Sequence, residues 1–311
     1  MSEILGAILL SMMEIHSLIT QQGAAAARQA AKSKHERAVI ETAVSILSTE
    51  EDTAAYSHAG FAMTSLPHKS TTETVWRRAG QNTTLIIQSG VDSRGEHIGL
   101  PFGALARMIL LYLQSEACKA NSPEVELGAN MKQWLRAMGL NVGGKTYRLV
   151  SNQAYRISTC NLAFITESRG SEVRQNATFV DRAITMLDCL DEQPSLWQDK
   201  VVLNQHFYQS LRASPVLISE GAIRAIGGRS LVLDIYIWLC YHLHDLTAEQ
   251  TIPWPLLHQQ FGSGFAALRQ FKAHFHQSLE IARAAYPSAR VEVADKGLIL
   301  RPSDPPIARV A

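Results

Sequence analysis

Residues 129–158 combine two short amphipathic patterns, a glycine-rich turn between them and no Asp or Glu. The basic residues of this window are Lys132, Arg136, Lys145, Arg148 and Arg156. The whole chain of 311 residues has a formal net charge of only +1, so this positive charge is local. A short basic helix after a tight turn fits the major groove of duplex DNA, whose phosphates attract it. We therefore predict that this window binds DNA.

Apolar spacing predicts which side of each helix is buried. In residues 131–138 the apolar residues recur at helical intervals, and Gly139 ends the pattern. A second helix is predicted over residues 144–158, with Gly143 and Gly144 at its start. Its apolar side consists of Tyr147, Val150, Ala154 and Ile157. Its opposite, outward side consists of Lys145, Arg148, Asn152 and Arg156.

The flanking segments complete an order of three helices and a hairpin. Pro101 opens the first helix, which carries one apolar stripe, and residues 83–88 are predicted to form a strand. After the third helix, residues 162–166 and 178–180 are predicted to be extended, with a turn near residues 168–171. Helix, helix, helix, hairpin is the order of a winged helix.

The same order recurs later in the chain, in pattern and not in residue identity. It consists of a helix at 232–243, a short helix at 253–261, a turn at 262–264, a long helix at 266–286, and strands at 290–293 and 298–300. The helix at 232–243 carries one apolar stripe, and the apolar face of the long helix consists of Leu268, Phe271, Phe275, Leu279, Ala282 and Tyr286. We therefore predict an α+β fold, mainly α, of tandem winged-helix domains with small β-hairpin wings. The predicted parts are an N-terminal helical arm (1–57), winged-helix domain 1 (58–190) and winged-helix domain 2 (191–311).

Base contacts are predicted for Arg148, Asn152 and Arg156, because Arg pairs well with guanine and Asn with adenine. Phosphate contacts are predicted for Lys132, Lys145 and the wing residues Arg169 and Arg174. The long helix at 266–286 is expected to read an adjacent turn of the duplex, about 34 Å away. Glu280 lies among the polar residues of this long helix, so a contact with another subunit is the alternative role for it. The predicted DNA-binding residues are Lys132, Lys145, Thr146, Arg148, Asn152, Arg156, Arg169, Arg174, Arg269, Lys272, His276 and Gln277.

Two motifs point to other chemistry. Residues 139–146 satisfy the phosphate-loop pattern GxxxxGK[ST], and residues 231–234 imitate a Walker B strand. A phosphate loop follows a buried strand, whereas helical patterns surround both segments here, so a P-loop ATPase is the weaker alternative. Cys240 and His244 share a helical face, but no second ligand pair lies nearby in the sequence. We predict no enzymatic activity, no metal and no cofactor.

The chain is expected to be cytoplasmic. The apolar N-terminal segment 4–10 is shorter than the roughly 20 residues of a membrane span, and no basic region precedes it as in a signal peptide. No CxxC pair occurs among the cysteines, so reduced thiols are expected. These cysteines are Cys118, Cys160, Cys189 and Cys240.

Several segments, taken in order, resemble the plasmid-encoded RepA replication initiators of proteobacteria. The first is HAGFAMTSLPHK at residues 58–69. The others are 99–101, 106–114, 125–128, 134–135, 143–148, Gln153, 156–158 and 233–239. The match is dense from His58 to Phe164 and patchier afterwards, and the N-terminal 57 residues match no motif of that family.

This resemblance implies an initiator that binds repeated sites, or iterons, in the double-stranded DNA of a plasmid origin and helps to open it for host replication proteins. It also implies self-association, as monomer and dimer, and repression of the protein's own gene. A winged-helix transcriptional repressor without an initiator role is the main alternative. Direct repeats beside the gene would favour initiation, and a lone palindrome would favour repression.

Overall fold

The computed structural model describes residues 11–49, 52–168, 171–181 and 199–307, and it is a mixed α/β structure as predicted. The chain divides into two compact units, each made of separate stretches. Unit 1 comprises Met1–Ala54, Leu217–Pro255 and Gly264–Ala311; unit 2 comprises Ala55–Val216 and Leu256–Ser263. Compactness alone does not show which segments fold independently, so the three-part division by sequence stays a prediction.

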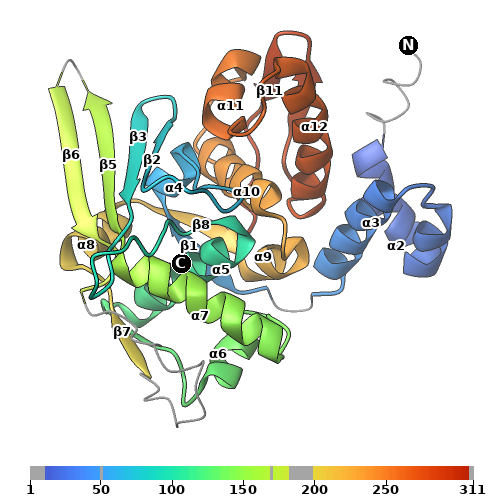
Figure 1. The fold of residues 1–311 in the computed structure, drawn as a ribbon. Coiled ribbons are helices and arrows are strands. Elements are labelled where there is room, and N and C mark those ends of the chain that lie inside the picture. Colours follow the sequence, from blue (N-terminus) through green and yellow to red (C-terminus); the bar gives the residue numbers. More distant parts are fainter. Residues whose placement is uncertain (1–10, 50–51, 169–170, 182–198, 308–311) are drawn as a thin grey trace. The chain divides into compact units, whose positions relative to one another are not determined.

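Unit 2 is built on a four-stranded antiparallel sheet with the order β2-β3-β5-β6 (Figure 1). Its helices α5 and α7 pack against one another. The elements are β1 (Ala54–His58), α4 (Ala59–Met63), β2 (Val75–Ala79), β3 (Thr83–Gln88), α5 (Gly103–Ala120), β4 (Glu124–Glu126), α6 (Met131–Ala137), α7 (Gly144–Thr159), β5 (Asn161–Ser168), β6 (Ser171–Thr178), β7 (Lys200–Val202), α8 (Gln205–Ala213) and β8 (Pro215–Ser219). Strands β1 and β8 contain the points where the chain passes between the units.

Alternation along the strands determines which side of the sheet faces the core. Leu85 pairs with Phe164 and Ile87 with Leu162, and all four side chains are buried. Strand β3 coincides with the predicted strand. Strand β5 ends at Ser168 and β6 begins at Ser171, on either side of the predicted turn, whose residues 169–170 lie outside the described part of the chain. The second extended segment was predicted at 178–180 and is wrong: β6 ends at Thr178 and begins at Ser171. Strand β6 could not be predicted from apolar alternation because its sequence is mostly polar. Its extended conformation depends on pairing with β5.

The three predicted helices of unit 2 enclose the core beside the sheet. Trp134 of α6 and Ile109 of α5 are completely buried, and the predicted inner residues Val150, Ala154 and Ile157 of α7 join the same cluster. Helix α6 begins with two side-chain caps that the spacing analysis missed, at Asn130, the N-cap residue, and at Gln133. Asn130 Oδ1 accepts from the backbone N–H of Gln133 at 3.0 Å, and Gln133 Oε1 accepts from that of Ala129 at 2.8 Å.

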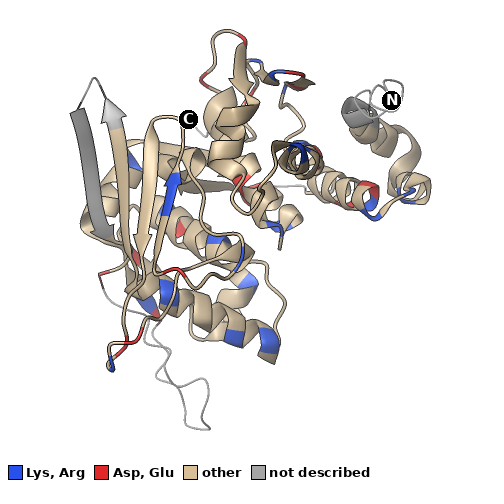
Figure 2. Cartoon of the chain, turned by 45° about the horizontal axis from the view of Figure 1, so that its top comes forward, with Lys and Arg blue, Asp and Glu red and all other residues tan. Residues whose placement is uncertain are grey.

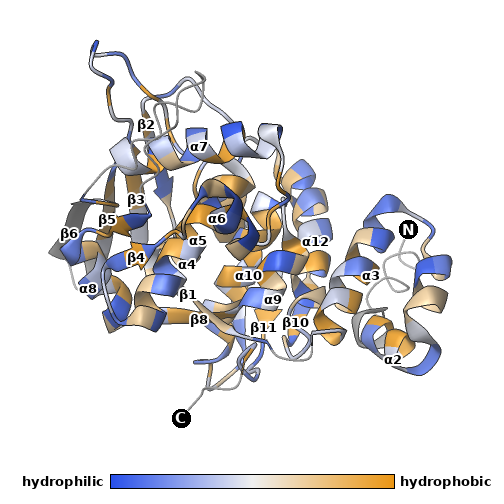
Figure 3. Cartoon of the chain, turned by 90° about the horizontal axis from the view of Figure 1, so that it is seen from below, coloured by the Kyte–Doolittle hydropathy of each residue, from blue (hydrophilic) through white to orange (hydrophobic). Residues whose placement is uncertain are grey.

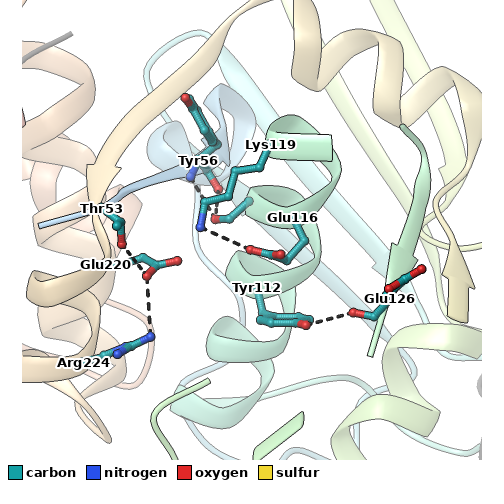
Figure 4. A network of polar contacts seen from close by, with 9 residues as sticks. Thr53, Tyr56, Tyr112, Glu116, Lys119, Glu126, Glu220 and Arg224 are labelled. Atoms are coloured by element: carbon teal, nitrogen blue, oxygen red, sulfur yellow. Dashed lines mark hydrogen bonds and ion pairs between the residues drawn. The ribbon is translucent and has the colours of Figure 1, made fainter. Parts of the chain in front are cut away.

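Polar side chains of α5 bond to strand β4 and to one another (Figure 4). The Tyr112 hydroxyl donates to the Glu126 carbonyl at 2.9 Å, which holds strand β4 against the helix. Lys119 forms an ion pair with Glu116 one turn earlier, at 3.2 Å. Within unit 1, a separate group joins Glu220 to the Thr53 hydroxyl at 2.6 Å and to Arg224 at 3.5 Å.

Unit 1 holds the second predicted set of elements around a three-stranded sheet with the order β10-β11-β9. Helix α12 buries Phe271, Phe275, Leu279 and Ala282 as predicted, whereas Leu268 is exposed. Helix α10 is buried on nearly every side instead of along one stripe. The elements are α2 (Ser11–Ala30), α3 (Lys34–Leu47), α9 (Glu220–Ile226), α10 (Ser230–Leu243), β9 (Gln250–Pro253), α12 (Leu268–Ala284), β10 (Val291–Ala294) and β11 (Gly297–Leu300). Helix α11 (Trp254–Phe261) begins in unit 1 and continues in unit 2.

The described part of the N-terminal segment is packed within unit 1. Helix α3 lies against α9 and α12, and its Val39, Ile40 and Ala43 are buried. Gly23, at a φ of 85°, interrupts α2, and an ion pair from Arg28 to Glu41 joins α2 to α3 at 2.9 Å. The buried apolar residues of this segment therefore pack against the helices that it covers.

His58 is held neutral in the core of unit 2. Its ring stacks on Phe164 and Phe207 with centroid distances of 4.7 and 5.1 Å, and its Nδ1 accepts from the Gly60 N–H at 2.9 Å. Burial lowers the pKa of His58 to about 4. The protonated ring is thus disfavoured in the folded chain, and the cap on α4 needs the neutral form.

We expect unit 2 to lose stability as the pH falls below 6.5. The unfolded chain protonates His58 near pH 6.5, whereas the folded chain resists until about pH 4, so the unfolded state binds more protons in that window. His58 should contribute on the order of 2 kcal/mol to the fall in the free energy of unfolding between pH 7 and pH 5. His68 of the same unit, whose pKa burial lowers to about 3, adds to the loss in the same direction. Urea unfolding at each pH measures this. His58→Asn should flatten the dependence, and an unchanged pH profile in that variant would contradict the assignment.

Candidate nucleic-acid interface

A single left-handed glycine makes the turn between α6 and α7. Gly139 has a φ of 69° and ends α6, and the Leu140 N–H bonds to the Leu135 carbonyl at 2.8 Å. Gly143 lies at a φ of −179°, which any residue adopts. The expectation that Gly143 and Gly144 shape the turn is therefore wrong. A Cβ at either of the two would have no atom within 4 Å, so the backbone at the start of α7 is open.

The outward sides of α6 and α7 form one exposed positive area. We call it the basic surface and define it as Lys132, Arg136, Lys145, Arg148 and Asn152, all of which are exposed. Figure 3 shows the hydrophilic side of α7 pointing away from α5 and α6, and Figure 2 shows Lys and Arg without Asp or Glu on these helices. Within the described part of the chain, no ion pair involves its lysines or arginines.

Arg156 differs from the other predicted base-reading residues because it is half-buried and hydrogen-bonded within the chain. Its guanidinium donates to the Leu100 carbonyl at 3.0 Å and to Asn152 Oδ1 at 2.8 Å, and lies 5.4 Å from the centre of the Phe102 ring. Burial lowers its pKa. Gly99, at a φ of 96°, leaves room for this side chain, since a Cβ there would lie 2.3 Å from the Arg156 Nη1.

The remaining predicted residues of unit 2 are Thr146, Arg174 and Arg169. Thr146 is half-buried in the first turn of α7. Arg174 lies in β6, where the register pairs it with Ile165 of β5. Arg169 lies outside the described residues.

Helix α12 of unit 1 presents only part of the predicted second interface. Arg269 and Gln277 are exposed. Lys272 and His276 are half-buried against Trp254, at 4.8 Å from ammonium to ring centre and 5.2 Å between ring centres. Burial lowers the pKa of His276, so its ring is neutral near pH 7. Packing on Trp254 gives Lys272 and His276 a structural role that their positions in the sequence did not indicate.

The C-terminal half of α12 is covered by the N-terminal helices. His35 of α3 pairs with Glu280, and His16 Nε2 of α2 lies 3.1 Å from the Ala284 carbonyl. Ile281 and Ala284 are buried there, although they lie outside the predicted apolar stripe. Glu280, which weakened the case for DNA binding by this helix, is thus engaged within unit 1.

Buried polar groups of the matching motifs serve the fold of unit 2. Gln153 Oε1 accepts from the Phe102 N–H at 2.9 Å. Arg107 is buried and donates to the carbonyls of Leu66 and Gly103, at 2.9 Å each. These side chains hold the start of α5 against α7 and the segment before β2. Gln153 and Arg107 therefore position the basic surface without belonging to it, whereas the motif at residues 143–148 contributes Lys145 and Arg148 to that surface.

Residues 139–146, residues 231–234 and Cys240 do not lie in the surroundings that a nucleotide or metal site requires. Helix α6 precedes residues 139–146, and residues 231–234 lie within helix α10, so neither segment follows or forms a strand. Cys240 is buried, and burial raises its pKa above the usual range of a thiol. Among the described residues there is no group of three or more metal-ligating side chains. A search of the described helices for one long and apolar enough to cross a membrane found none.

Arg156 and Arg148 should differ in their effect on stability. Arg156→Ala removes hydrogen bonds to Leu100 and Asn152, so we expect the free energy of unfolding to drop by about 1–3 kcal/mol. Arg148→Ala alters an exposed position and should change it by less than about 0.5 kcal/mol. Urea unfolding of both variants tests this, and equal effects would mean that Arg156 is not structural.

Comparisons with solved structures found a similar fold. A crystal structure of domains 2 and 3 of RctB superposes with a TM-score of 0.51 and 10% sequence identity, covering 81% of this chain and 97% of that chain. A second crystal structure of RctB domains 2–3 has a TM-score of 0.49 and 10% identity, with coverages of 77% and 93%. At such identity the first comparison shows the fold alone. No curated protein sequence matches the chain.

A family model described as plasmid encoded RepA protein matches residues 100–255. The matched stretch is half of the chain, and it contains α5, α6 and α7 with the whole basic surface. It also includes most of the segments on which the sequence resemblance was based. The resemblance is confirmed: the chain belongs to the family of plasmid-encoded RepA proteins.

Proposed function

We propose that this protein is a plasmid replication initiator that binds iterons in the double-stranded DNA of its origin and assists the opening of that origin. The observation that carries the proposal is the basic surface on α6 and α7, exposed and free of acidic neighbours in the sequence. DNA attracts such a surface through its phosphates. Membership of the RepA family supports the role in replication.

Both units support a winged-helix mode of binding. In unit 2, α5, α6 and α7 are followed by the β5–β6 hairpin. Later in the chain the order is α10, β9, α11, α12, β10, β11; all of these elements but most of α11 belong to unit 1, where β9 pairs with β11 to complete a three-stranded sheet. In this architecture the third helix enters the major groove and the hairpin contacts the backbone. We assign these roles to α7 and β5–β6, and to α12 and β10–β11.

The start of α7 suits a phosphate. Gly143 and Gly144 have no side chains and no neighbouring atoms at their Cβ positions, so a phosphate can approach the first N–H groups of the helix. The helix dipole and Lys145 add positive potential at that end. This contact would position α7 without selecting a sequence.

Arg148 and Asn152 are the residues proposed to select bases. Arg148 is exposed and donates two hydrogen bonds in the geometry that guanine accepts. The Asn152 carbonyl oxygen already accepts from Arg156 at 2.8 Å and from Gln153 Nε2 at 3.5 Å, which fixes the amide and leaves its NH₂ group to donate to the N7 acceptor of adenine. Arg156 then acts on base reading through Asn152 as a positioning residue.

Other parts of the proposal concern partners. We propose that the protein acts in the bacterial cytoplasm, recruits host replication proteins, self-associates as monomer and dimer, and represses its own gene by binding nearby DNA. A transcriptional repressor without an initiator role is the second candidate. A footprint of the purified chain on DNA flanking its gene separates the two, since direct repeats support initiation and a lone palindrome supports repression.

Substitutions on the basic surface should affect DNA binding in two ways. Arg148→Ala should cost about 1–3 kcal/mol on a footprinted site and reduce base preference. Lys145→Ala should weaken all sequences alike and flatten the salt dependence by about one unit. Fluorescence anisotropy at several salt concentrations measures both. Lys119→Ala, which alters a lysine paired with Glu116, is the control. Wild-type binding by both variants would refute the α7 interface.

Helix α12 should contribute a second contact to the same DNA. Arg269→Ala removes an exposed cation at the start of that helix, so we expect weaker binding and loss of protection over one side of the footprint. Lys272→Ala should instead reduce stability, because Lys272 packs on Trp254. An Arg269→Ala footprint identical to that of the wild type would show that α12 does not contact DNA.

A further inference from the structure

One large apolar side chain is exposed in the middle of the basic surface. Leu149 of α7 is 46% exposed. On the helix it follows Lys145 by four residues and precedes Asn152 by three, so it shares their face. Val142, seven residues earlier in the turn before α7, is also exposed at 43%. A leucine at this place contributes nothing to the core that α7 covers.

We propose that Leu149 contacts the C5-methyl group of a thymine in the major groove and thereby selects thymine at one position of the DNA site. This rests on the proposed function, because it takes α7 as the helix that enters the groove. Thymine alone among the four DNA bases presents a methyl group there, and small apolar side chains recognise it by contact. Removing a leucine side chain and a methyl group from water together stabilises the complex.

The charge around Leu149 favours DNA over a second copy of this chain. In a symmetric dimer through this face, Lys145 and Arg148 would meet the same residues of the partner, and like charges in contact are costly. No acidic residue within 129–158 is present to offset them. A polyanion satisfies the cations and still offers an apolar group to Leu149. The surface is thus complementary to a thymine-containing groove.

The test uses the full chain and a duplex selected by it from random sequences, with each thymine replaced in turn by deoxyuridine. That change removes only the methyl group. For the wild type, one thymine per bound site should be sensitive, with affinity about fourfold weaker after replacement. Leu149→Ala should bind the unmodified duplex about as weakly as the wild type binds the deoxyuridine duplex. Replacing the thymine should not weaken the binding of this variant further. Leu149→Met keeps an apolar contact and should retain the sensitivity.

Controls separate this proposal from the one on which it rests. Leu47→Ala alters a leucine of similar exposure, 45%, on α3, and should leave the deoxyuridine sensitivity unchanged. If Arg148→Ala weakens binding but Leu149→Ala loses affinity on deoxyuridine replacement at the same position as the wild type, the thymine contact is wrong and the α7 interface stands. If neither variant differs from the wild type, the α7 interface itself is wrong. If Leu149→Ala instead dissociates a dimer in sedimentation velocity, the side chain serves self-association and the thymine contact is overturned.

Discussion

The burial of one side of α7 decides what the other side can do. Val150, Ala154 and Ile157 enter the same core as Trp134 of α6, and this packing sets the rotation of α7 about its axis. With that rotation, Lys145, Arg148 and Asn152 face water. A helix of sixteen residues gains little stability by itself, so the apolar contacts and not helical propensity hold these groups in position. The interface is therefore a product of the core.

Polar side chains that are buried or half-buried also fix the loops around α7. Gln153, Arg156 and Arg107 bond to backbone groups near both ends of the segment from Leu66 to Gly103. Leaving a buried polar group without its partner is costly, so each of these contacts discriminates against other arrangements of the loop. Many of the residues that resemble the RepA family are of this kind. These buried residues fix the geometry of the fold. The exposed residues are the ones proposed to recognise DNA.

Much of this could be predicted from the sequence because periodicity reports burial. The stripes of α5, α6, α7 and α12 and strand β3 were predictable, since each depends on apolar residues at regular spacing. The strands β4 and β7 were not, because each has three residues and they pair across 74 positions or more of the chain. The half-burial of Arg156 was equally hidden: helical spacing placed it on the outward side, but a loop from before α5 reaches over it. Gly139 and Gly143 likewise look alike in sequence and differ only in φ.

The composition of unit 1 has a consequence for the order of events during synthesis. Helix α3 emerges from the ribosome early, yet the helices that cover it, α9 and α12, are encoded in the last third of the chain. At the usual pace of translation this delay is on the order of ten seconds or more. Val39 and Ile40 must remain without their final neighbours for that time, whereas nearly all of unit 2 has been made before α9 appears. Unit 1 can therefore complete its packing around α3 only after α12 has been synthesised, although α3 is one of the first elements of the chain to be made.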